Sequence, residues 1–376
     1  MKLIYLSGSA IPSRGANSIQ VMRMCEAFAE NGHETTLIGK QFEDSLSQGI
    51  YEYYGVQKNF ELLLIPCRKI KGVNVLVLPK LCRILRRYDP EGVLVYARDI
   101  YGASLAIRMG FRVIYEAHAA PYNGLIRYLE ASLLKNSRLI RCVAISEALK
   151  TLYTSQFDIA DKVVVCHDAA VVPNVSVSTS LPWPACRDTL QIGYTGHLYP
   201  GRGIEIILEC AKRLPQCDFH IVGGEEKDIT FWKAESPVNA CFHGFLEPAV
   251  IHEARARCDV LLMPYQREIT NPHSHLNTVP WMSPMKLFEY MASRRAIVAS
   301  DLTALREVLD EQTAVLVEPA DPEQWVNAIL RCHDQGFRQS LAEHAYGVFL
   351  ERHTWGKRAQ MVLEGITTKA LEPHVF

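Results

Sequence analysis

The sequence predicts an α/β protein made of two doubly wound domains of similar size. Short apolar runs alternate with amphipathic helical patterns through both halves of the chain. Most of these runs lack strict apolar–polar alternation, which is typical of parallel strands buried on both faces by helices. The length of 376 residues also exceeds what one core usually holds. We therefore expect two parallel sheets, each wrapped by its own helices.

Composition excludes several classes of protein. Hydrophobic residues make up 48% and charged residues 22%, which is typical of a globular chain. A formal net charge of −1 argues against a nucleic-acid partner, which would require a strong positive excess. The 11 cysteines show neither C-x-x-C pairs nor zinc-finger spacing. The start, MKLIYLSGSAIPSRG, lacks the long apolar region of a secretory signal, and no window resembles a membrane span, so we expect a cytoplasmic protein.

The first domain is predicted over residues 1–170. Strands are expected at residues 2–8, 33–39, 92–98, 111–118, 141–146 and 162–169, and helices at 17–32, 103–110, 123–136 and 147–156. Gly32 is well placed to end the first of these helices. The order of strands and helices is that of a doubly wound sheet.

A change of composition separates this domain from the second. Residues 171–189, VVPNVSVSTSLPWPACRDT, are rich in Pro, Ser and Thr and carry no periodic pattern, so they are interpreted as a linker. The second domain is predicted over residues 190–352. Its strands are expected near residues 189–196, 217–224, 240–246, 259–265, 295–300 and 313–319, and its helices near 203–214, 248–257, 283–292, 304–309 and 321–336. Residues 353–376 exceed what this domain needs and are predicted to form a helix that crosses back to the first domain.

The stretch SPMKLFEYMA at residues 283–292 predicts an anion site. Ser283 is expected as the N-cap and Pro284 as the first helical residue. The amides of Met285, Lys286 and Leu287 then lack partners at the positive end of the helix dipole. Glu289 lies about one and a half turns further, where its carboxylate could accept hydrogen bonds from ribose hydroxyls. The alternative is a plain capped helix with a solvated glutamate.

Three further positions are candidates for the same ligand. Arg202 lies in the glycine-rich turn of IGYTGHLYPGRGIE, where it could clamp phosphate oxygens; the alternative is a solvated loop cation. Gly15 lies in a Ser/Gly/Pro loop before the first helix, and His118 follows a buried strand at the edge where ligands bind. A lone histidine is more often structural. Neither glycine loop is G-x-G-x-x-G, and no D-x-D motif is present to hold a metal.

Together these segments resemble the retaining glycosyltransferases of family four, which have the GT-B fold. The resemblance covers nearly the whole chain. It includes the loop near Gly15, His118, YTGHLYPGRGIE, IVGG, FHGFLEP, LREVL, HTWGKRA and, most specifically, SPMKLFEYMASRRAIVASD. It implies two Rossmann-like domains, the first binding the acceptor and the second a nucleotide-sugar donor, with no cofactor and no metal.

The resemblance also implies roles for individual residues. Glu289 would hold the donor ribose, residues 285–287 would offer amides to the diphosphate, and Arg202 would neutralise it. Gly15 would approach the distal phosphate and His118 the donor sugar near the reacting carbon. The residues expected to border the base are Gly223, Gly224 and Phe245.

Two positions depart from the family pattern. Trp281 stands where the family commonly has a glutamate that grips sugar hydroxyls, and His197 stands where it commonly has arginine. The first change alters the contacts expected for the donor sugar, and the second removes a cation from the phosphate site. We treat both as traits of a subgroup that shares the S-P-x-K-x-F-E-Y-M motif, with loss of activity as the alternative.

A basic segment bears on the acceptor. Residues 68–87, RKIKGVNVLVLPKLCRILRR, contain seven Lys or Arg and no acid. Each basic residue near an anionic bilayer contributes about 1 kcal/mol of attraction. The segment therefore favours peripheral attachment at the inner face of a membrane; the alternative is a helix with a solvated basic face.

The sequence as a whole predicts a metal-independent, retaining glycosyltransferase. It would move a hexose from a UDP- or GDP-linked donor to a glycan or lipid-linked acceptor. The alternatives are a GT-B nucleotide-sugar epimerase or hydrolase and a non-catalytic nucleotide-sugar binding protein.

Overall fold

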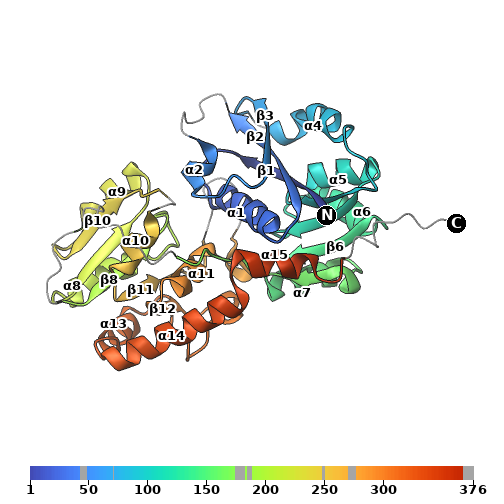
Figure 1. The fold of residues 1–376 in the computed structure, drawn as a ribbon. Helices are drawn as coiled ribbons and strands as arrows, with labels where there is room; N and C mark the ends of the chain where they lie inside the picture. Colours follow the sequence, from blue (N-terminus) through green and yellow to red (C-terminus); the bar gives the residue numbers. More distant parts are fainter. Residues whose placement is uncertain are drawn as a thin grey trace. The chain divides into compact units, whose positions relative to one another are not determined.

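The computed structural model describes residues 1–42, 49–70, 72–173, 183, 189–247, 250–269 and 277–366. The chain divides into two compact units (Figure 1). Unit 1 comprises Met1–Asp168 and Trp355–Phe376, and unit 2 comprises Ala169–Thr354. Most of the linker predicted at 171–189 lies outside the described residues, as do Lys71, Pro248 and the end of the segment predicted at 353–376.

Unit 1 contains a seven-stranded parallel sheet in the order β3-β2-β1-β4-β5-β6-β7. Its strands are β1 Lys2–Ala10, β2 Glu34–Phe42, β3 Glu61–Cys67, β4 Val93–Ala97, β5 Arg112–Ala117, β6 Leu139–Ala144 and β7 Val163–Val165. Its helices are α1 Ala16–Glu30, α2 Ile50–Tyr54, α3 Val73–Leu76, α4 Leu78–Leu85, α5 Ile100–Arg108, α6 Gly124–Leu134, α7 Glu147–Gln156 and α15 Trp355–Leu363, with the 3-10 turn η1 at Ala160–Lys162. Side chains of Asp99, Asn123 and Ser146 cap α5, α6 and α7, which fixes where these helices begin.

Helix α15 comes from the end of the chain but packs within unit 1, alongside α1. The side-chain amide of Asn31, at the end of α1, donates to the carbonyl of Gly356 at 3.1 Å. Arg141 of β6 donates to the carbonyl oxygens of Val362 at 2.8 Å and Glu364 at 2.7 Å. Both ends of the helix are therefore fixed to unit 1.

Unit 2 contains a six-stranded parallel sheet in the order β10-β9-β8-β11-β12-β13. Its strands are β8 Gln191–Thr195, β9 Asp218–Val222, β10 Ala240–Gly244, β11 Val260–Met263, β12 Ala296–Ser300 and β13 Val315–Val317. Its helices are α8 Ile204–Arg213, α9 Glu226–Lys233, α10 Ile251–Ala256, α11 Met285–Ala292, α12 Thr303–Arg306, α13 Pro322–Arg331 and α14 Gln335–Arg352, with η2 at Val279–Trp281. The prediction of two doubly wound α/β domains is confirmed.

Several elements were not predicted. Strand β3 is an edge strand with Pro66 in it, and α2, α3 and α9 are short. Helix α14 spans 18 residues, but only Leu341, Ala342, Ala345 and Phe349 are buried, and it contains two glycines. Its apolar stripe is thus too narrow to stand out in the sequence. None of the described helices is both long enough and apolar enough to cross a bilayer.

A pair of histidines packs beside Trp183 in unit 2. Nδ1 of His220 lies 3.0 Å from Nε2 of His243, and Nε2 of His220 lies 2.7 Å from Oε1 of Gln191. The Trp183 ring stacks on His243 with ring centroids 4.3 Å apart. The amide nitrogen of Gln191 donates to Thr189, so its oxygen faces His220, which must present Nε2–H. Burial, and then His243, lower the pKa of His220 to about 4.

We expect acid to destabilise the protein through this pair. The folded-state pKa of His220 lies below the ordinary value of 6.5, so its contribution is fully present above about pH 6.5 and is lost as pH falls toward about 4. A shift of this size corresponds to at most about 3 kcal/mol. Urea denaturation near pH 7.5 and near pH 5 measures the loss, and His220→Gln should reduce it. His344→Gln, on the exposed side of α14, is the control. An unchanged pH dependence in His220→Gln would show that the pair does not titrate on unfolding.

Candidate functional site

Helix α11 begins one residue later than predicted. Its N-cap is Pro284, with no side-chain cap, whereas Ser283 was predicted as the cap and Pro284 as the first helical residue. Ser283 is instead buried ahead of the helix. As a result, the amide of Leu287 already donates to the carbonyl of Pro284 at 2.9 Å, so the prediction of a third open amide was wrong. The amides of Met285 and Lys286 are the ones left at the start of α11.

Lys286 also places a buried basic side chain at the start of α11. Only 9% of the residue is exposed, and its Nζ lies 3.8 Å from the ring centroid of Tyr194 and 5.1 Å from that of Tyr265. Nζ has no hydrogen-bond partner among the described residues. Burial, and then the nearby Arg202, lower the pKa of Lys286 well below its usual value. Lys286 is therefore a buried basic group that has no counter-ion among the described residues.

The backbone of Gly196 makes room for Lys286. This glycine has a φ of +147°, and a Cβ built on it would lie 2.7 Å from Nζ of Lys286. Any side chain here would therefore displace the ammonium. In the turn after β8, the Nζ of Lys286 therefore lies next to the backbone of Gly196.

Arg202 is a second cation in the same place. It precedes Gly203, the N-cap of α8, and its guanidinium carbon lies 4.5 Å from the ring centroid of Tyr199 and 5.2 Å from that of Tyr265. It donates to the hydroxyl of Tyr199, while its buried Nε has no partner among the residues that the structure describes. Within the described residues, neither Arg202 nor Lys286 has a carboxylate at ion-pair distance. Two cations are thus held by cation–π contacts with tyrosines, an arrangement that would attract an anion.

Within the described part of the chain, Glu289 is paired with Arg255 and not with Lys286 or Arg202. Its Oε2 accepts from Nη2 of Arg255 at 2.5 Å, and Nε of Arg255 donates to Oγ1 of Thr195 at 3.3 Å. The Glu289 side chain is 26% exposed, and its Oε1 has no partner among the described residues. Glu289 is therefore not simply solvated: one oxygen is fixed by Arg255 and the other is open to a ligand. Sequence reasoning missed Arg255, because nothing distinguishes it from other arginines in a short helix.

The remaining residues predicted for this half lie on neighbouring loops. Gly223 and Gly224 have φ of +109° and +85°, and a Cβ on Gly223 would come within 2.3 Å of the carbonyl oxygen of Gly196. These glycines therefore allow the loops after β8 and β9 to touch. His197 is exposed, with its ring 5.4 Å from that of Tyr199, and Phe245 is 39% exposed after β10.

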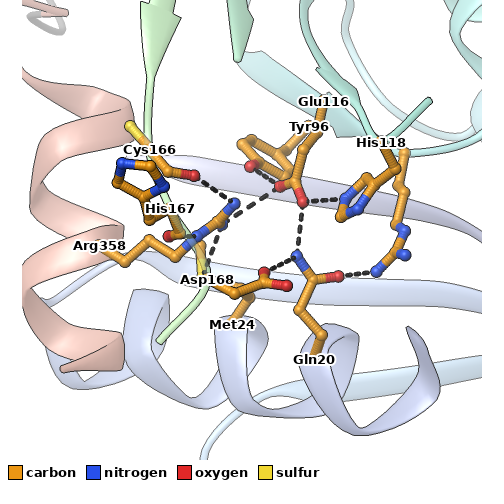
Figure 2. Close-up of polar contacts among 10 residues, drawn as sticks. Gln20, Met24, Tyr96, Glu116, His118, Cys166, His167, Asp168 and Arg358 are labelled. Atoms are coloured by element: carbon orange, nitrogen blue, oxygen red, sulfur yellow. Dashed lines mark hydrogen bonds and ion pairs between the residues drawn. The ribbon is translucent and has the colours of Figure 1, made fainter. Parts of the chain in front are cut away.

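Unit 1 holds the other two predicted residues. Gly15 is the N-cap of α1, and a Cβ there would lie 2.6 Å from Oδ1 of Asn17. His118 directly follows β5, and Nε2 of its ring contacts Oε1 of Glu116. Figure 2 shows that Glu116 is the centre of a buried network that also includes Arg358 of α15. Neither Glu116 nor Arg358 was predicted, because no local pattern links residues so far apart in sequence.

A small pocket lies at the carboxyl ends of β1 and β2 in unit 1. Its polar lining is Ser7, Lys40, Asn74 and Asp99, and its apolar lining includes Val77 and Leu81 of the α4 region. Lys40 is buried and its Nζ contacts Oδ1 of Asn74, while Asp99 caps α5 through one carboxylate oxygen. Burial lowers the pKa of Lys40 and raises that of Asp99. The pocket thus presents one cation and one carboxylate to a small polar group.

We also searched the described residues for groups of side chains that could bind a metal ion. Among the described residues, no cluster of three or more His, Cys, Asp or Glu side chains is close enough to hold an ion. The charged side chains at the site in unit 2 are mainly cations.

Each half of the chain matches the model of a glycosyltransferase family. A family model described as Glycosyltransferase Family 4 matches residues 18–169, and one described as Glycosyl transferases group 1 matches residues 189–335. The search of curated protein sequences gave no match.

Solved structures similar to this chain include three that match it over nearly the whole of both chains. HepE from Anabaena, in complex with UDP and glucose, has a TM-score of 0.71 and 17% identity over 97% of this chain and 98% of its own. Sucrose-phosphate synthase from Thermosynechococcus elongatus has a TM-score of 0.69 and 16% identity over 96% of each chain. A glycosyltransferase from Rickettsia africae has a TM-score of 0.69 and 13% identity over 97% of this chain and 99% of its own. The fold is therefore GT-B, and with both halves matched the chain belongs to the glycosyltransferases of family four and group 1.

Proposed function

We propose that the protein transfers a hexose from a nucleotide diphosphate sugar to a glycan or lipid-linked acceptor, with retention and without a metal. The observation that carries this proposal is the pair of basic side chains Lys286 and Arg202, which have no carboxylate partner among the described residues, beside the first amides of α11. A diphosphate would supply the missing counter-charge. That HepE was solved with UDP and glucose supports a UDP-linked donor over a GDP-linked one.

The cations would also promote departure of the leaving group. Negative charge grows on the diphosphate as the bond to the anomeric carbon breaks, so fixed positive groups stabilise the transition state more than the ground state. The helix amides supply only about half an elementary charge, so Lys286 and Arg202 would supply most of the positive charge that faces the diphosphate. With His197 in place of the family's arginine, Lys286 would supply the second full charge once the diphosphate beside it favours its protonated form. The acceptor hydroxyl would attack from the face that the leaving group vacates, and a diphosphate oxygen would take its proton.

The acceptor is proposed to approach unit 1 at the pocket lined by Lys40 and Asp99. A carboxylate and an ammonium together suit the hydroxyls of a sugar or polyol, which both donate and accept. The wall formed by Asn74, Val77 and Leu81 belongs to the segment with the basic run at 68–87.

The outer face of that segment suits a membrane. Exposed apolar residues Ile70 at 52%, Val75 at 48% and Leu76 at 59% stand near exposed basic residues. These basic residues are Lys69, Lys80, Arg83, Arg86 and Arg87. Apolar side chains beside cations are typical of helices that lie on anionic bilayers. A polar pocket next to such a face favours a lipid-linked acceptor, whose head would enter the pocket while its tail stays in the membrane.

A transfer assay tests the function. The protein is incubated with UDP- and GDP-hexoses and with lipid or glycan extracts, and products are identified by mass spectrometry. We expect an acceptor that gains one hexose, with the anomeric configuration of the donor. Release of free hexose or isomerised donor without any acceptor would identify a hydrolase or epimerase. Donor binding without any conversion would identify a binding protein.

Two substitutions separate binding from turnover at the donor site. Glu289→Ala should weaken UDP affinity about 10- to 100-fold, because a charged hydrogen bond to ribose contributes roughly 1.5–3 kcal/mol. Arg202→Met should lower turnover more than affinity, because its partner charge is largest in the transition state. Calorimetry with UDP and steady-state rates measure the two effects. Wild-type affinity and rate in both variants would rule out this donor site.

Lys286→Met should change stability and affinity in opposite directions. Removing a buried basic group that has no partner among the described residues should stabilise the unliganded protein by roughly 1–3 kcal/mol. The same change should weaken UDP binding about 10- to 100-fold. Urea denaturation and calorimetry on one preparation test both effects, with Lys212→Met, exposed on α8, as the control. A variant that is less stable, or that binds UDP as tightly as the wild type, contradicts the role given to Lys286.

Membrane attachment through the basic segment is tested by sedimentation with anionic liposomes. Replacing Arg83, Arg86 and Arg87 with Glu should abolish most binding, and salt should weaken binding of the wild type. The matched control replaces three exposed basic residues of unit 2, Lys212, Lys233 and Arg331, with Glu. Equal loss in both triple variants would mean that net charge, not this face, governs binding.

A further inference from the structure

We infer that Glu116 and, through it, Arg358 are positioning residues that fix the tautomer of His118 and leave its Nδ1 as the acceptor of a substrate hydrogen bond. The tautomer follows from the structure of unit 1 alone. That the bound hydroxyl belongs to a sugar rests on the proposed function.

Glu116 is surrounded by donors. Its carboxylate is fully buried and receives Nε2 of Gln20 at 2.5 Å, Nη1 of Arg358 at 3.3 Å and the hydroxyl of Tyr96 (Figure 2). An ionised carboxylate only accepts hydrogen bonds. The fourth contact, from Nε2 of His118, must therefore also be a donor, so this nitrogen carries the proton.

Arg358 keeps Glu116 ionised. Although burial opposes the charge, Arg358 and then His118 hold the pKa of Glu116 well below its usual value. The guanidinium is itself fixed by the carbonyl oxygens of His167 at 2.8 Å and Cys166 at 3.3 Å, and by Sδ of Met24 at 3.3 Å. Helix α15 thus supplies the cation that makes Glu116 an obligate acceptor.

With both of its carboxylates and both of its guanidinium groups ionised, the network balances in charge only if His118 is neutral. The network contains two acids, Glu116 and Asp168, and two arginines, Arg358 and Arg98. Gln20 connects Asp168 to Arg98, because its amide donates to Asp168 at 3.2 Å and accepts from Arg98. A proton on His118 would add an uncompensated charge. Burial, and then Arg98, lower the pKa of His118, against the opposite effect of Glu116.

Nδ1 is the ring atom left for a ligand. The His118 side chain is 20% exposed, and Nδ1 makes no hydrogen bond within the described part of the chain. In a neutral ring with Nε2 protonated, Nδ1 carries a lone pair. His118 therefore accepts from a hydroxyl and does not act as an acid through this atom.

Nitrogen NMR of the full-length protein labelled with 15N-histidine tests the tautomer without any substrate. At about pH 7 we expect the His118 resonances, assigned with His118→Asn, to show a protonated Nε2 and an unprotonated Nδ1. A protonated Nδ1, in a neutral or charged ring, would overturn the inference. If this tautomer is found but no nucleotide sugar is converted, the proposed function fails and the tautomer stands.

Variants test whether Glu116 and Arg358 set this tautomer. Glu116→Gln and Arg358→Met should each make the tautomers mix and lower kcat about 10- to 100-fold, with a smaller effect on KM. In Glu116→Gln, any acid limb of the pH–rate profile should move to lower pH, because Glu116 raises the pKa of His118. Glu130→Gln is the matched control: this buried glutamate is held by hydroxyls of Tyr115 at 2.9 Å and Tyr153 at 2.8 Å. A wild-type tautomer and rate in folded Glu116→Gln would exclude positioning.

Discussion

The ion pair between Arg358 and Glu116 is the interaction on which the interior of unit 1 depends. Both side chains are almost fully excluded from water, and each would carry a large desolvation penalty alone. Their partners come from β4, β5, α1 and the segment after β7, so the pair joins elements that are distant in sequence. Removing either charge would leave the other without its ion-pair partner, next to the end of β5 that bears His118. Stability and site geometry are therefore coupled in this unit.

In unit 2, by contrast, two of the basic groups at the site are not paired with carboxylates among the described residues. Lys286 and Arg202 are held by aromatic rings and receive no carboxylate among the described residues, so part of their desolvation penalty is not offset within the protein. Glu289, the nearest acid with a predicted role, is turned toward Arg255. Such a local excess of charge lowers the stability of the unliganded unit and raises its affinity for an anion. This is the balance expected where binding has been favoured over stability.

Local patterns in the sequence were sufficient to predict most of the fold and the loops that carry the site. Helix α7 has the bounds that its cap and apolar spacing predict, and β8 and β9 match their apolar runs. The start of α11 was misplaced by one residue, because serine and proline can each precede a helix and the choice depends on burial of Ser283. Arg255, Glu116 and Arg358 were missed for a different reason. The ion pairs Arg255–Glu289 and Glu116–Arg358 join residues 34 and 242 positions apart, and a single sequence contains no signal for such pairing.

The return of α15 to unit 1 also determines when that unit can be completed. During synthesis β1–β7 emerge first, but Arg358 follows only after the whole of unit 2. Until then Glu116 lacks the guanidinium of Arg358, and the part of α1 that packs against α15 is not covered by it. Unit 2 is one uninterrupted segment and needs nothing downstream of Thr354. On the ribosome, unit 1 is therefore the first unit to be synthesised and the last to have all of its elements.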